Sequence, residues 1–328
     1  MKPRRIGLAL LVGGSASFVG CSYIASRALA SRLISSEGLG PTLAQREDLL
    51  EALRASGAEV FDFRHRGSAR HPVELAAILA SPGDPERRPT LLFLHGKGGS
   101  SAEWQPDALR ALSLGYNVLL PDLRAHAPSG GTFVTYGFLE KDDLANAVEA
   151  ARERFGLDAE RLGVHACSAG STVALEFAAR RPEVRALWLE SPYADTREMA
   201  RHYLSVATGL PEWMLDLTTR LALRRALARI RRELKLPARG GGFDRVDPVR
   251  SLTQVHACVC LVHGERDELV PPRFAGRLEA CLPEGSLVWR APGAGHCHHE
   301  DEAAKVAKEE YERRWTEFFL TNLPADRS

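Results

Sequence analysis

The chain has 328 residues, of which 45% are hydrophobic, 26% charged and 7% aromatic. This is a globular composition, and it excludes collagen-like, coiled-coil and disordered chains. The 43 basic and 42 acidic residues nearly cancel, which argues against a protein that binds nucleic acid through overall positive charge.

The N-terminal segment, residues 1–35, begins with Lys2, Arg4 and Arg5 and continues with an uncharged stretch over 6–25. A basic head before such a stretch is typical of an export signal or a membrane anchor, and twenty helical residues can just cross a bilayer core of about 30 Å. Two alternatives stay open: a lipoprotein lipidated at Cys21, and a cleaved signal or buried helix. The sequence therefore predicts a membrane-associated protein of the cell envelope, with its body outside the cytoplasm.

From residue 57 onward the chain alternates strand-like and helix-like segments, after a connector at 36–56 that ends in a short helix. Two apolar runs suit an antiparallel start, and the later continuous runs suit strands buried on both faces. We predict strands at 58–64, 73–80, 90–95, 117–120, 162–166, 184–189, 257–263 and 286–290, and helices at 102–114, 138–156, 170–181, 272–282 and 302–319. Such alternation predicts a mostly parallel sheet with helices on both faces.

Residues 194–250 interrupt this alternation with helical patterns at 194–207 and 212–236. We interpret them as a helical cap inserted between two parts of the core, 57–193 and 251–322, with a tail at 323–328. Within the cap, Leu223, Leu227, Ile230 and Leu234 form a stripe, and arginines fill the rest of that helix. Packing on the core, contact with an anionic membrane and steering of an anionic substrate all stay open. Trp213 and Met214 are candidates for lining a substrate pocket.

The segment 162–171 carries the strongest catalytic signal, because an apolar strand runs into Ala166-x-Ser168-x-Gly170 and a helix follows. This layout is typical of a nucleophile elbow, whose sharp turn exposes a serine hydroxyl above the sheet. Ala166 stands where glycine is usual and costs one methyl group. The alternative is that Ser168 only caps the helix.

A serine nucleophile needs a base and an acid, and both are expected after later strands in the order serine, acid, histidine. Asp267 follows the strand at 257–263, and His296 lies in a glycine-rich loop after the strand at 286–290. Alternatives stay open at both positions, because Glu265 and Glu268 flank the aspartate and His298 and His299 follow the histidine. The cluster at 296–300 is also a weak candidate for a metal site, but we predict no metal.

The loop after the strand at 90–95 reads His95-Gly96-Lys97-Gly98-Gly99. A tetrahedral intermediate needs two backbone N–H donors. We assign one to Ala169, directly after the nucleophile, and one to Lys97, with Gly98 beside the substrate. The spacing of a phosphate-binding loop is not present, and we expect His95 to be structural.

Together these segments resemble the α/β-hydrolase superfamily over about residues 58–320. The resemblance rests on the elbow, on His95-Gly96, on the segment from Asp122 to Gly130, which looks like Asp-x-Arg-x-His-Gly-x-Ser with Ala127 for glycine, and on His263-Gly264-x-x-Asp267-x-x-Val270-Pro271. Tyr136-Gly137 with Glu140 and Asp143 resembles the opening of the helix before the nucleophile strand. The membrane-anchored or exported bacterial serine hydrolases, including prolyl-oligopeptidase-like and dienelactone-hydrolase-like branches, are the nearest in character.

This resemblance implies the α/β-hydrolase fold, with an eight-stranded, mostly parallel sheet, a helical cap insertion and no cofactor. We therefore predict a serine hydrolase that cleaves an ester, thioester or amide of a small-molecule acyl substrate, with a carboxylesterase or lipase-like activity first. A peptidase of the acylaminoacyl type and a non-catalytic scaffold that binds a ligand at the membrane stay open, since one fold hosts many functions. The six cysteines form no Cys-x-x-Cys pair, which removes the usual structural zinc and thioredoxin motifs.

Overall fold

The computed structural model describes residues 20–35, 43–236, 242–297 and 304–325, and the side chains of 43 and 304–307 are not among the described ones. The chain divides into two compact units. One comprises Met1–Ser35 with Thr196–Gly240, and the other comprises Ser36–Asp195 with Gly241–Ser328. Each unit is described by itself below.

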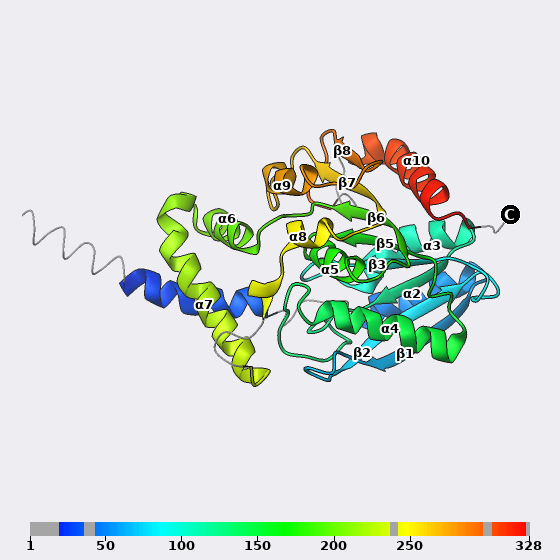
Figure 1. Ribbon diagram of the computed structural model, residues 1–328, viewed down its shortest axis with the longest axis horizontal. Coiled ribbons are helices and arrows are strands. Elements are labelled where there is room, and N and C mark those ends of the chain that lie inside the picture. The colour runs from blue at the N-terminus through cyan, green and yellow to red at the C-terminus, as the bar shows by residue number, and fades with distance from the viewer. Residues whose placement is uncertain (1–19, 36–42, 237–241, 298–303, 326–328) are drawn as a thin grey trace, which may run out of the picture. The chain divides into compact units, whose positions relative to one another are not determined.

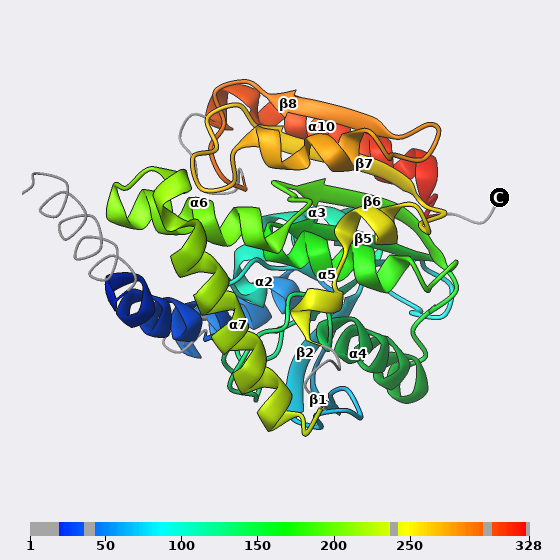
Figure 2. The same cartoon turned by 60° about the vertical axis from the view of Figure 1, so that its left-hand side comes forward.

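The larger unit is built on an eight-stranded sheet with the order β1-β2-β4-β3-β5-β6-β7-β8 (Figures 1 and 2). The first two pairings, β1 with β2 and β2 with β4, are antiparallel, and the other five are parallel. The strands are β1 (Glu59–Arg66), β2 (Glu74–Ser81), β3 (Thr90–Leu94), β4 (Asn117–Pro121), β5 (Leu162–Cys167), β6 (Val184–Glu190), β7 (Cys258–Gly264) and β8 (Leu287–Ala291). Each predicted strand is found within two residues of its predicted start and end, so the predicted fold class is confirmed.

Helices cover both faces of the sheet, and two apolar cores lie between them and the strands. Strands β3, β4 and β5 are buried along their whole length, as their continuous apolar runs require. One core includes buried residues of α4 (Glu140–Phe155), α5 (Ala169–Ala178), α8 (Pro248–Leu252) and α9 (Gly276–Glu279). The other includes buried residues of α2 (Leu43–Ala55), α3 (Gln105–Ser113) and α10 (Ala304–Asn322).

The predicted helices are found with shifted ends. The helix predicted at 102–114 begins with a 3-10 turn, Ser101–Trp104, before α3. The helix predicted at 272–282 is a 3-10 turn, Pro272–Ala275, followed by the four residues of α9. Apolar periodicity alone does not separate a short α-helix from such a turn, because both repeat at three to four residues.

The smaller unit is helical in its described part. Residues 20–34 form a helix, and the inserted segment forms α6 (Thr196–Thr208), a 3-10 turn (Glu212–Leu215) and α7 (Asp216–Glu233). The side chain of Arg225 lies 4.1 Å from the ring centre of Tyr23 and donates a hydrogen bond to the Ser26 hydroxyl, which joins α7 to the helix over 20–34. The cap as a cover over the strands stays a prediction.

The buried face of α7 agrees with the predicted stripe only in part. Ile230 and Leu234 are buried as predicted, whereas Leu223 and Leu227 are half-buried and Ala222 and Ala226 are buried instead. Small residues occupy the centre of the buried face. Leucines and arginines alternate around them, so the sequence does not show which side of α7 is buried. The Trp213 side chain is 78% exposed and Met214 is half-buried, so their assignment to a substrate pocket stays a prediction.

Across the described ranges, which begin at residue 20, we find no helix long and apolar enough to cross a membrane. Most of the predicted signal or anchor stretch, residues 6–19, lies outside the described residues. Cys21, the residue of the lipoprotein alternative, is exposed in the helix over 20–34. The envelope location and the membrane contact stay predictions.

Candidate active site

Ser168 lies on the sharp turn between β5 and α5, with φ 52° and ψ −120°. A positive φ is strained for a residue with a side chain, and it is retained here because the backbone on both sides is held. The Ser168 N–H donates to Glu190 O at 2.9 Å, and the Ser171 N–H donates to Ser168 O at 3.0 Å. The turn has the geometry expected of a nucleophile elbow.

Glycines next to the turn allow a close approach of two backbones. A Cβ at Gly170 would lie 2.5 Å from Leu94 O and 2.6 Å from His95 O, so only glycine fits there. Gly96 lies on the other side of the serine, and a Cβ there would be 3.3 Å from the Ser168 Cβ. The loop after β3 therefore passes directly beside Ser168, as an oxyanion loop must.

Asp267 and His296 are brought together by the ends of β7 and β8. His296 Nδ1 lies 2.9 Å from Asp267 Oδ2, and the other carboxylate oxygen accepts the Val270 N–H at 2.7 Å. Gly264 makes this approach possible, because a Cβ there would lie 2.1 Å from Gly295 O. Burial is the largest influence on Asp267 and acts to raise its pKa, but the hydrogen bond and charge of His296 together with the hydrogen bonds from Val270 and Ser191 outweigh it, so the pKa of this carboxyl lies below its usual value.

The alternative acids occupy different positions. Asp267 is 3% exposed, whereas Glu265 and Glu268 are both exposed at the surface. The alternative bases, His298 and His299, lie outside the described residues, as does Glu300 of the candidate metal cluster.

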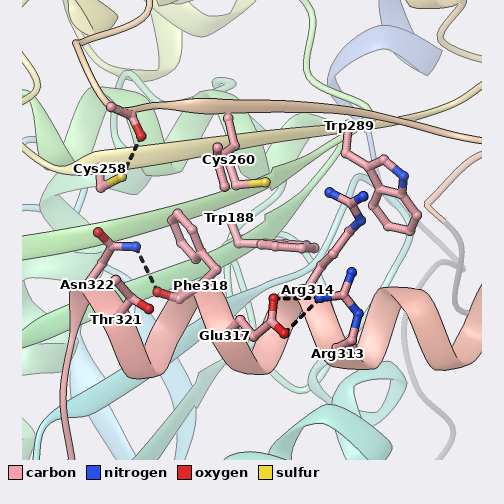
Figure 3. Close-up of a pocket in the computed structure, with 12 residues that line it drawn as sticks. Trp188, Cys258, Cys260, Trp289, Arg313, Arg314, Glu317, Phe318, Thr321 and Asn322 are labelled. Carbon is pink, nitrogen blue, oxygen red and sulfur yellow. Dashed lines mark hydrogen bonds and ion pairs between the residues drawn. The ribbon is translucent and has the colours of Figure 1, made fainter.

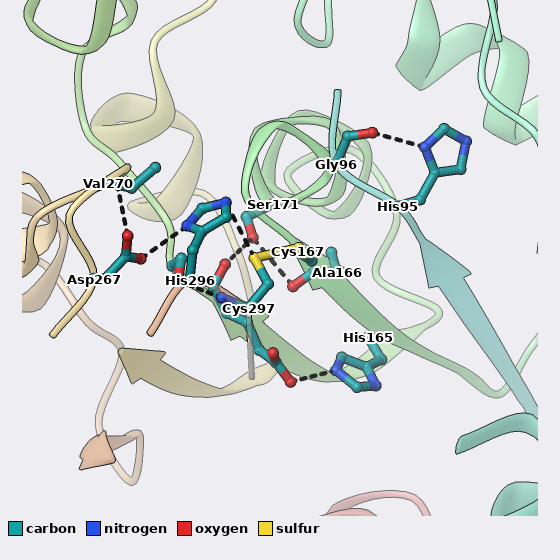
Figure 4. The surroundings of a disulfide bond; sticks show 12 residues. His95, Gly96, His165, Ala166, Cys167, Ser171, Asp267, Val270, His296 and Cys297 are labelled. Carbon is teal, nitrogen blue, oxygen red and sulfur yellow. Dashed lines mark hydrogen bonds and ion pairs between the residues drawn. A yellow bond between two sulfur atoms is a disulfide. The ribbon is translucent and has the colours of Figure 1, made fainter. Parts of the chain in front are cut away.

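A disulfide between Cys167 and Cys297 links the residue before the candidate nucleophile to the residue after the candidate base (Figure 4). The two Cα atoms are 6.0 Å apart across 130 residues of sequence. His296 Nε2 lies 3.4 Å from Cys297 Sγ, and no hydrogen bond joins it to the Ser168 hydroxyl in the described structure. This pair is not predicted from the sequence, although each cysteine is adjacent to a candidate catalytic residue.

Ser191 is a further residue of the site that is not predicted from the sequence. It follows β6 directly, is 1% exposed and has φ 45°. Its hydroxyl accepts the Cys297 N–H at 3.3 Å and also hydrogen-bonds to the Asp267 carboxylate, where it lowers the pKa of that group. Ser191 therefore ties the acid loop to the base loop. Its position after a central parallel strand was the available signal.

The loop that carries Lys97 and Gly98 is held by two histidines. The Gly98 N–H donates to His126 Nε2 at 3.0 Å, and the opposite nitrogen of that ring lies 3.0 Å from Arg124 O. His95 uses Nδ1 toward Gly96 O at 2.8 Å and accepts the Leu123 N–H at Nε2. Both rings thus act as neutral imidazoles that donate once and accept once. The backbone N–H groups of Lys97 and Ala169 stay the predicted oxyanion donors.

These two histidines predict a loss of stability in acid. Burial lowers the pKa of His95 and of His126 from 6.5 to about 4. Between pH 6.5 and 4 the unfolded chain binds protons that the folded chain does not, so the free energy of unfolding falls as the pH is lowered through this window. At pH 5 each histidine is expected to cost on the order of 2 kcal/mol relative to pH 7. Urea unfolding at both pH values measures the drop.

The matched variant is His126→Gln, whose amide can donate and accept without titrating. We expect its stability drop between pH 7 and pH 5 to be smaller than that of the wild type by about 2 kcal/mol. The exposed His256 provides the control His256→Gln, in which the drop stays as in the wild type. An equal drop in wild type and His126→Gln contradicts the assignment.

Two buried ion pairs hold the segment that follows β4. Arg124 contacts both carboxylate oxygens of Asp143, each at 2.6 Å, and both side chains are almost fully buried. Asp122 accepts the Ser101 N–H at 2.9 Å and a charged hydrogen bond from Arg46 at 2.5 Å. The segment that resembles Asp-x-Arg-x-His therefore fixes the loop from which His126 supports Gly98.

Below the elbow lies a buried polar cluster around Glu190, the last residue of β6. Its Oε1 accepts from Tyr311 at 2.6 Å and from Trp188 at 3.1 Å, and it lies 2.8 Å from His165 Nε2. Burial raises the pKa of Tyr311 well above its usual value, so this hydroxyl stays protonated and donates. Glu190 also accepts the Ser168 N–H through its backbone carbonyl, which anchors the elbow.

Two cavities of the larger unit differ in their relation to these residues. A small cavity of about 20 Å³ is lined by Gly96, Lys97, Ala169 and Tyr136 among others, next to the candidate oxyanion donors. A larger one of about 400 Å³ lies beside β7, β8 and α10, where Arg314 and Trp289 line it (Figure 3). None of Ser168, Asp267 and His296 lines the larger cavity, so it is not the reaction site proposed below.

Comparison with known proteins gives a match to a model of the alpha/beta hydrolase family over residues 91–309. A region of 173 residues is 31% identical to the uncharacterised protein YqkD of Bacillus subtilis and covers 51% of each chain. A region of 209 residues is 28% identical to an uncharacterised protein of Mycobacterium tuberculosis and covers 63% of each chain. The match thus spans between half and two thirds of the length of these relatives.

Solved structures give a similar picture. An esterase of Pyrococcus furiosus has a TM-score of 0.61 at 22% identity, over 82% of this chain and 94% of that one. An acylaminoacyl peptidase of Pyrococcus horikoshii has a TM-score of 0.59 at 17% identity, over 83% and 42%. A bacterial membrane phospholipase A has a TM-score of 0.55 at 21% identity, over 97% and 98%. At these identities the likeness concerns the fold alone.

Proposed function

The chain belongs to the alpha/beta hydrolase family, and we propose that it is a serine hydrolase that cleaves acyl bonds through Ser168, His296 and Asp267. The observation that carries the proposal is the strained φ of Ser168 at the strand-to-helix turn, in a sheet whose later strand ends bring His296 and Asp267 into a hydrogen bond. Retaining such strain is typical of functional sites.

The reaction begins with attack of the Ser168 oxygen on the substrate carbonyl carbon. The serine proton passes to His296 Nε2, after rotation of the imidazole away from Cys297 Sγ toward the hydroxyl. The backbone N–H groups of Lys97 and Ala169 bind the oxyanion. The tetrahedral intermediate expels the leaving group, which takes the proton from His296, and leaves an acyl-enzyme that water then hydrolyses by the same path.

Asp267 has two tasks in this scheme. Its Oδ2 accepts the Nδ1–H of His296, which leaves Nε2 unprotonated and able to act as base. Its pKa below the usual value keeps the carboxylate ionised at neutral pH, so its charge stabilises the imidazolium that forms during attack. Asp267 stays ionised throughout and receives no proton.

We assign the substrate class as a carboxylic ester, in an activity of the carboxylesterase or lipase type. The structural neighbours include both an esterase and an acylaminoacyl peptidase, so amide substrates form the second arm of the test. A panel of p-nitrophenyl esters of increasing chain length, run beside acylaminoacyl p-nitroanilides, ranks the two classes by kcat/KM.

The proposal predicts that a fluorophosphonate probe labels purified protein at Ser168. The probe reacts with a serine only when a base withdraws its proton, so labelling reports an activated hydroxyl rather than an exposed one. Peptide mass mapping is expected to place the adduct on the peptide that contains Ser168, with one adduct per chain. His296→Ala is expected to reduce the labelling rate by at least about 10²-fold, because the base is lost.

Ser168→Ala serves as the negative control and is expected to carry no adduct. A folded wild-type protein that is not labelled, or that carries the adduct on another serine, contradicts the proposed site. Retention of labelling in His296→Ala contradicts only the assignment of the base, and the same assay on His298→Ala and His299→Ala then tests the two alternatives.

A further inference from the structure

We propose that reduction of the Cys167–Cys297 disulfide creates a binding site for one zinc ion, with the two cysteine thiolates and His296 Nε2 as ligands. The Sγ atoms and the imidazole nitrogen all lie within 4.8 Å of one another. Both cysteines are buried and His296 is half-buried. Three ligands of the types that zinc prefers thus converge on one point at the carboxyl ends of β5 and β8.

The spacing of the three atoms suits a single ion. Zinc is bound by cysteine sulfur at about 2.3 Å and by histidine nitrogen at about 2.0–2.1 Å, so two ligands of one ion lie at most about 4.6 Å apart. His296 Nε2 already lies 3.4 Å from Cys297 Sγ. All three ligand atoms start within 4.8 Å of one another, and the two sulfur atoms have to move apart once the bond between them is broken.

The second nitrogen of His296 is held as zinc ligands require. A ligating histidine generally donates its other N–H to a carboxylate, which fixes the ring and raises its basicity. His296 Nδ1 lies 2.9 Å from Asp267 Oδ2, and Asp267 is in turn held by the Val270 N–H. The arrangement that presents Nε2 as a base in the oxidised protein therefore presents the same lone pair to a metal in the reduced one (Figure 4).

The chemistry balances with a dithiol as reductant. The dithiol transfers two electrons and two protons to the disulfide and is itself oxidised to a disulfide, which leaves two thiols at Cys167 and Cys297. Zinc then displaces both thiol protons into solvent. Two thiolates cancel the double charge of the ion, so the complex with a neutral imidazole carries no net charge, which favours it in a buried site. The fourth position stays open to water.

A thiophilic cation is favoured over magnesium or calcium by the ligand set itself. Sulfur and imidazole ligands select zinc and similar metals, whereas magnesium and calcium take oxygen ligands. The four other cysteines of the chain are unpaired, and none of them belongs to such a cluster in the described residues.

The consequence for the reaction rests on the proposed function. An ion on Nε2 occupies the lone pair that would accept the Ser168 proton, so zinc switches the hydrolase off in the reduced state. In the oxidised protein the two sulfur atoms are bonded to each other and cannot bind zinc as thiolates. Metal binding and catalysis then exclude each other at one imidazole.

The test uses the full-length protein in its oxidised form and after reduction by a dithiol, with the reductant removed under nitrogen. Zinc is titrated in competition with a chromophoric chelator, and cobalt replaces zinc in a parallel sample to give the thiolate-to-metal absorption of a Cys–His site. We expect one metal per chain in the reduced protein and none in the oxidised protein. Equal binding by both forms, or no binding by a reduced protein that keeps its near-ultraviolet circular dichroism, overturns the proposal. Loss of the fold on reduction overturns it too, because the site has to be preformed.

Variants assign the ligands. Cys167→Ala, Cys297→Ala and His296→Ala are each expected to weaken zinc binding by more than about 100-fold, and Asp267→Asn by about 10–100-fold through the loss of support to the ring. The matched control is the double variant Cys258→Ala Cys260→Ala, which removes the two free cysteines of β7 and is expected to bind one metal as the wild type does. Binding that survives in Cys167→Ala and Cys297→Ala but disappears in the control contradicts the assigned site.

Activity provides a separate readout. Zinc is expected to inhibit ester hydrolysis by the reduced protein at one equivalent, with recovery on addition of a chelator, and to leave the oxidised protein active. A protein that binds zinc as described but hydrolyses nothing in either state contradicts the proposed function and leaves the metal site standing. A protein that hydrolyses esters in both states but binds no metal contradicts the metal site and leaves the proposed function standing.

Discussion

Ser168→Ala is expected to lower kcat for p-nitrophenyl butyrate by about 10⁶-fold. Alanine has no oxygen to attack the carbonyl, so no acyl-enzyme forms, and only water bound near the oxyanion donors can react. The residual rate is expected to stay about 10³–10⁴-fold above the uncatalysed rate, because the proposed oxyanion donors, the N–H groups of Lys97 and Ala169, stay in place. Initial rates with active-site-titrated wild type as reference measure the loss.

Ser171→Ala is the matched control, since this serine lies in the first turn of the same helix. Among the described residues, its hydroxyl bonds to the carbonyl oxygens of Ala166 and Glu190, each at 3.2 Å. We expect this variant to keep its rate within about tenfold and to lose about 1 kcal/mol of stability from the broken hydrogen bonds. A Ser168→Ala protein that keeps its rate within tenfold shows that Ser168 is not the nucleophile.

Asp267→Asn is expected to lower kcat by about 10⁴-fold with little change in fold. The reason lies in the two fixed partners of this side chain. Val270 presents an N–H to one oxygen, so the asparagine has to turn its own oxygen there and its NH₂ toward His296. The imidazole then accepts at Nδ1 and carries its proton on Nε2, where it can no longer take the proton of Ser168.

The exposed neighbours of Asp267 provide the control for this variant. Glu265→Gln and Glu268→Gln are expected to keep their rates within about threefold, because neither carboxylate is buried against the histidine. Rates are compared at saturating substrate over a pH series, with unfolding curves to show that all three variants are folded. A large loss in Glu268→Gln together with a small loss in Asp267→Asn contradicts the assignment of Asp267 and favours Glu268 as the acid.

The sheet could be predicted from the sequence nearly residue by residue. Strands such as β3 and β5 are buried on both faces, and continuous apolar runs bounded by polar turns have few other interpretations. The antiparallel start was also predictable, since β1 alternates buried and exposed positions over part of its length, as a strand at the sheet edge does. The helix ends were less predictable, because a 3-10 turn and a short helix share their periodicity.

For the candidate site, too, some features could be predicted from the sequence and others could not. Ser168, Asp267 and His296 each follow a predicted strand, and parallel strands end at one edge, so their proximity could be predicted without knowing the register. The contacts across the site could not. Cys167 and Cys297 are 130 residues apart, and β8 lies three strands away from β5, so the loop after β8 has to return toward β5 before the two Cα atoms lie 6.0 Å apart. The role of Ser191 is likewise not predictable from the sequence, because its contacts with Asp267 and Cys297 depend on how the loops after β7 and β8 fold beside the end of β6.

The face of α7 shows a different limit. A leucine stripe was the obvious choice for the buried side, yet Ala222 and Ala226 are buried at its centre. Small residues allow a close approach between helices, and the gain depends on the partner helix rather than on their own hydrophobicity. The sequence of α7 alone holds no information about what packs against this face.

The bond between Cys167 and Cys297 makes the chain between them a covalent ring. That ring contains β6, β7 and β8 together with the whole inserted segment. A single peptide-bond cut anywhere from residue 168 to residue 296 therefore yields no separate fragment, since both pieces stay attached through sulfur. Of the three proposed catalytic residues, Ser168 would remain on one piece with Asp267 and His296 on the other after a cut in the insertion. A protease could thus open the inserted segment without parting the nucleophile from its acid and base.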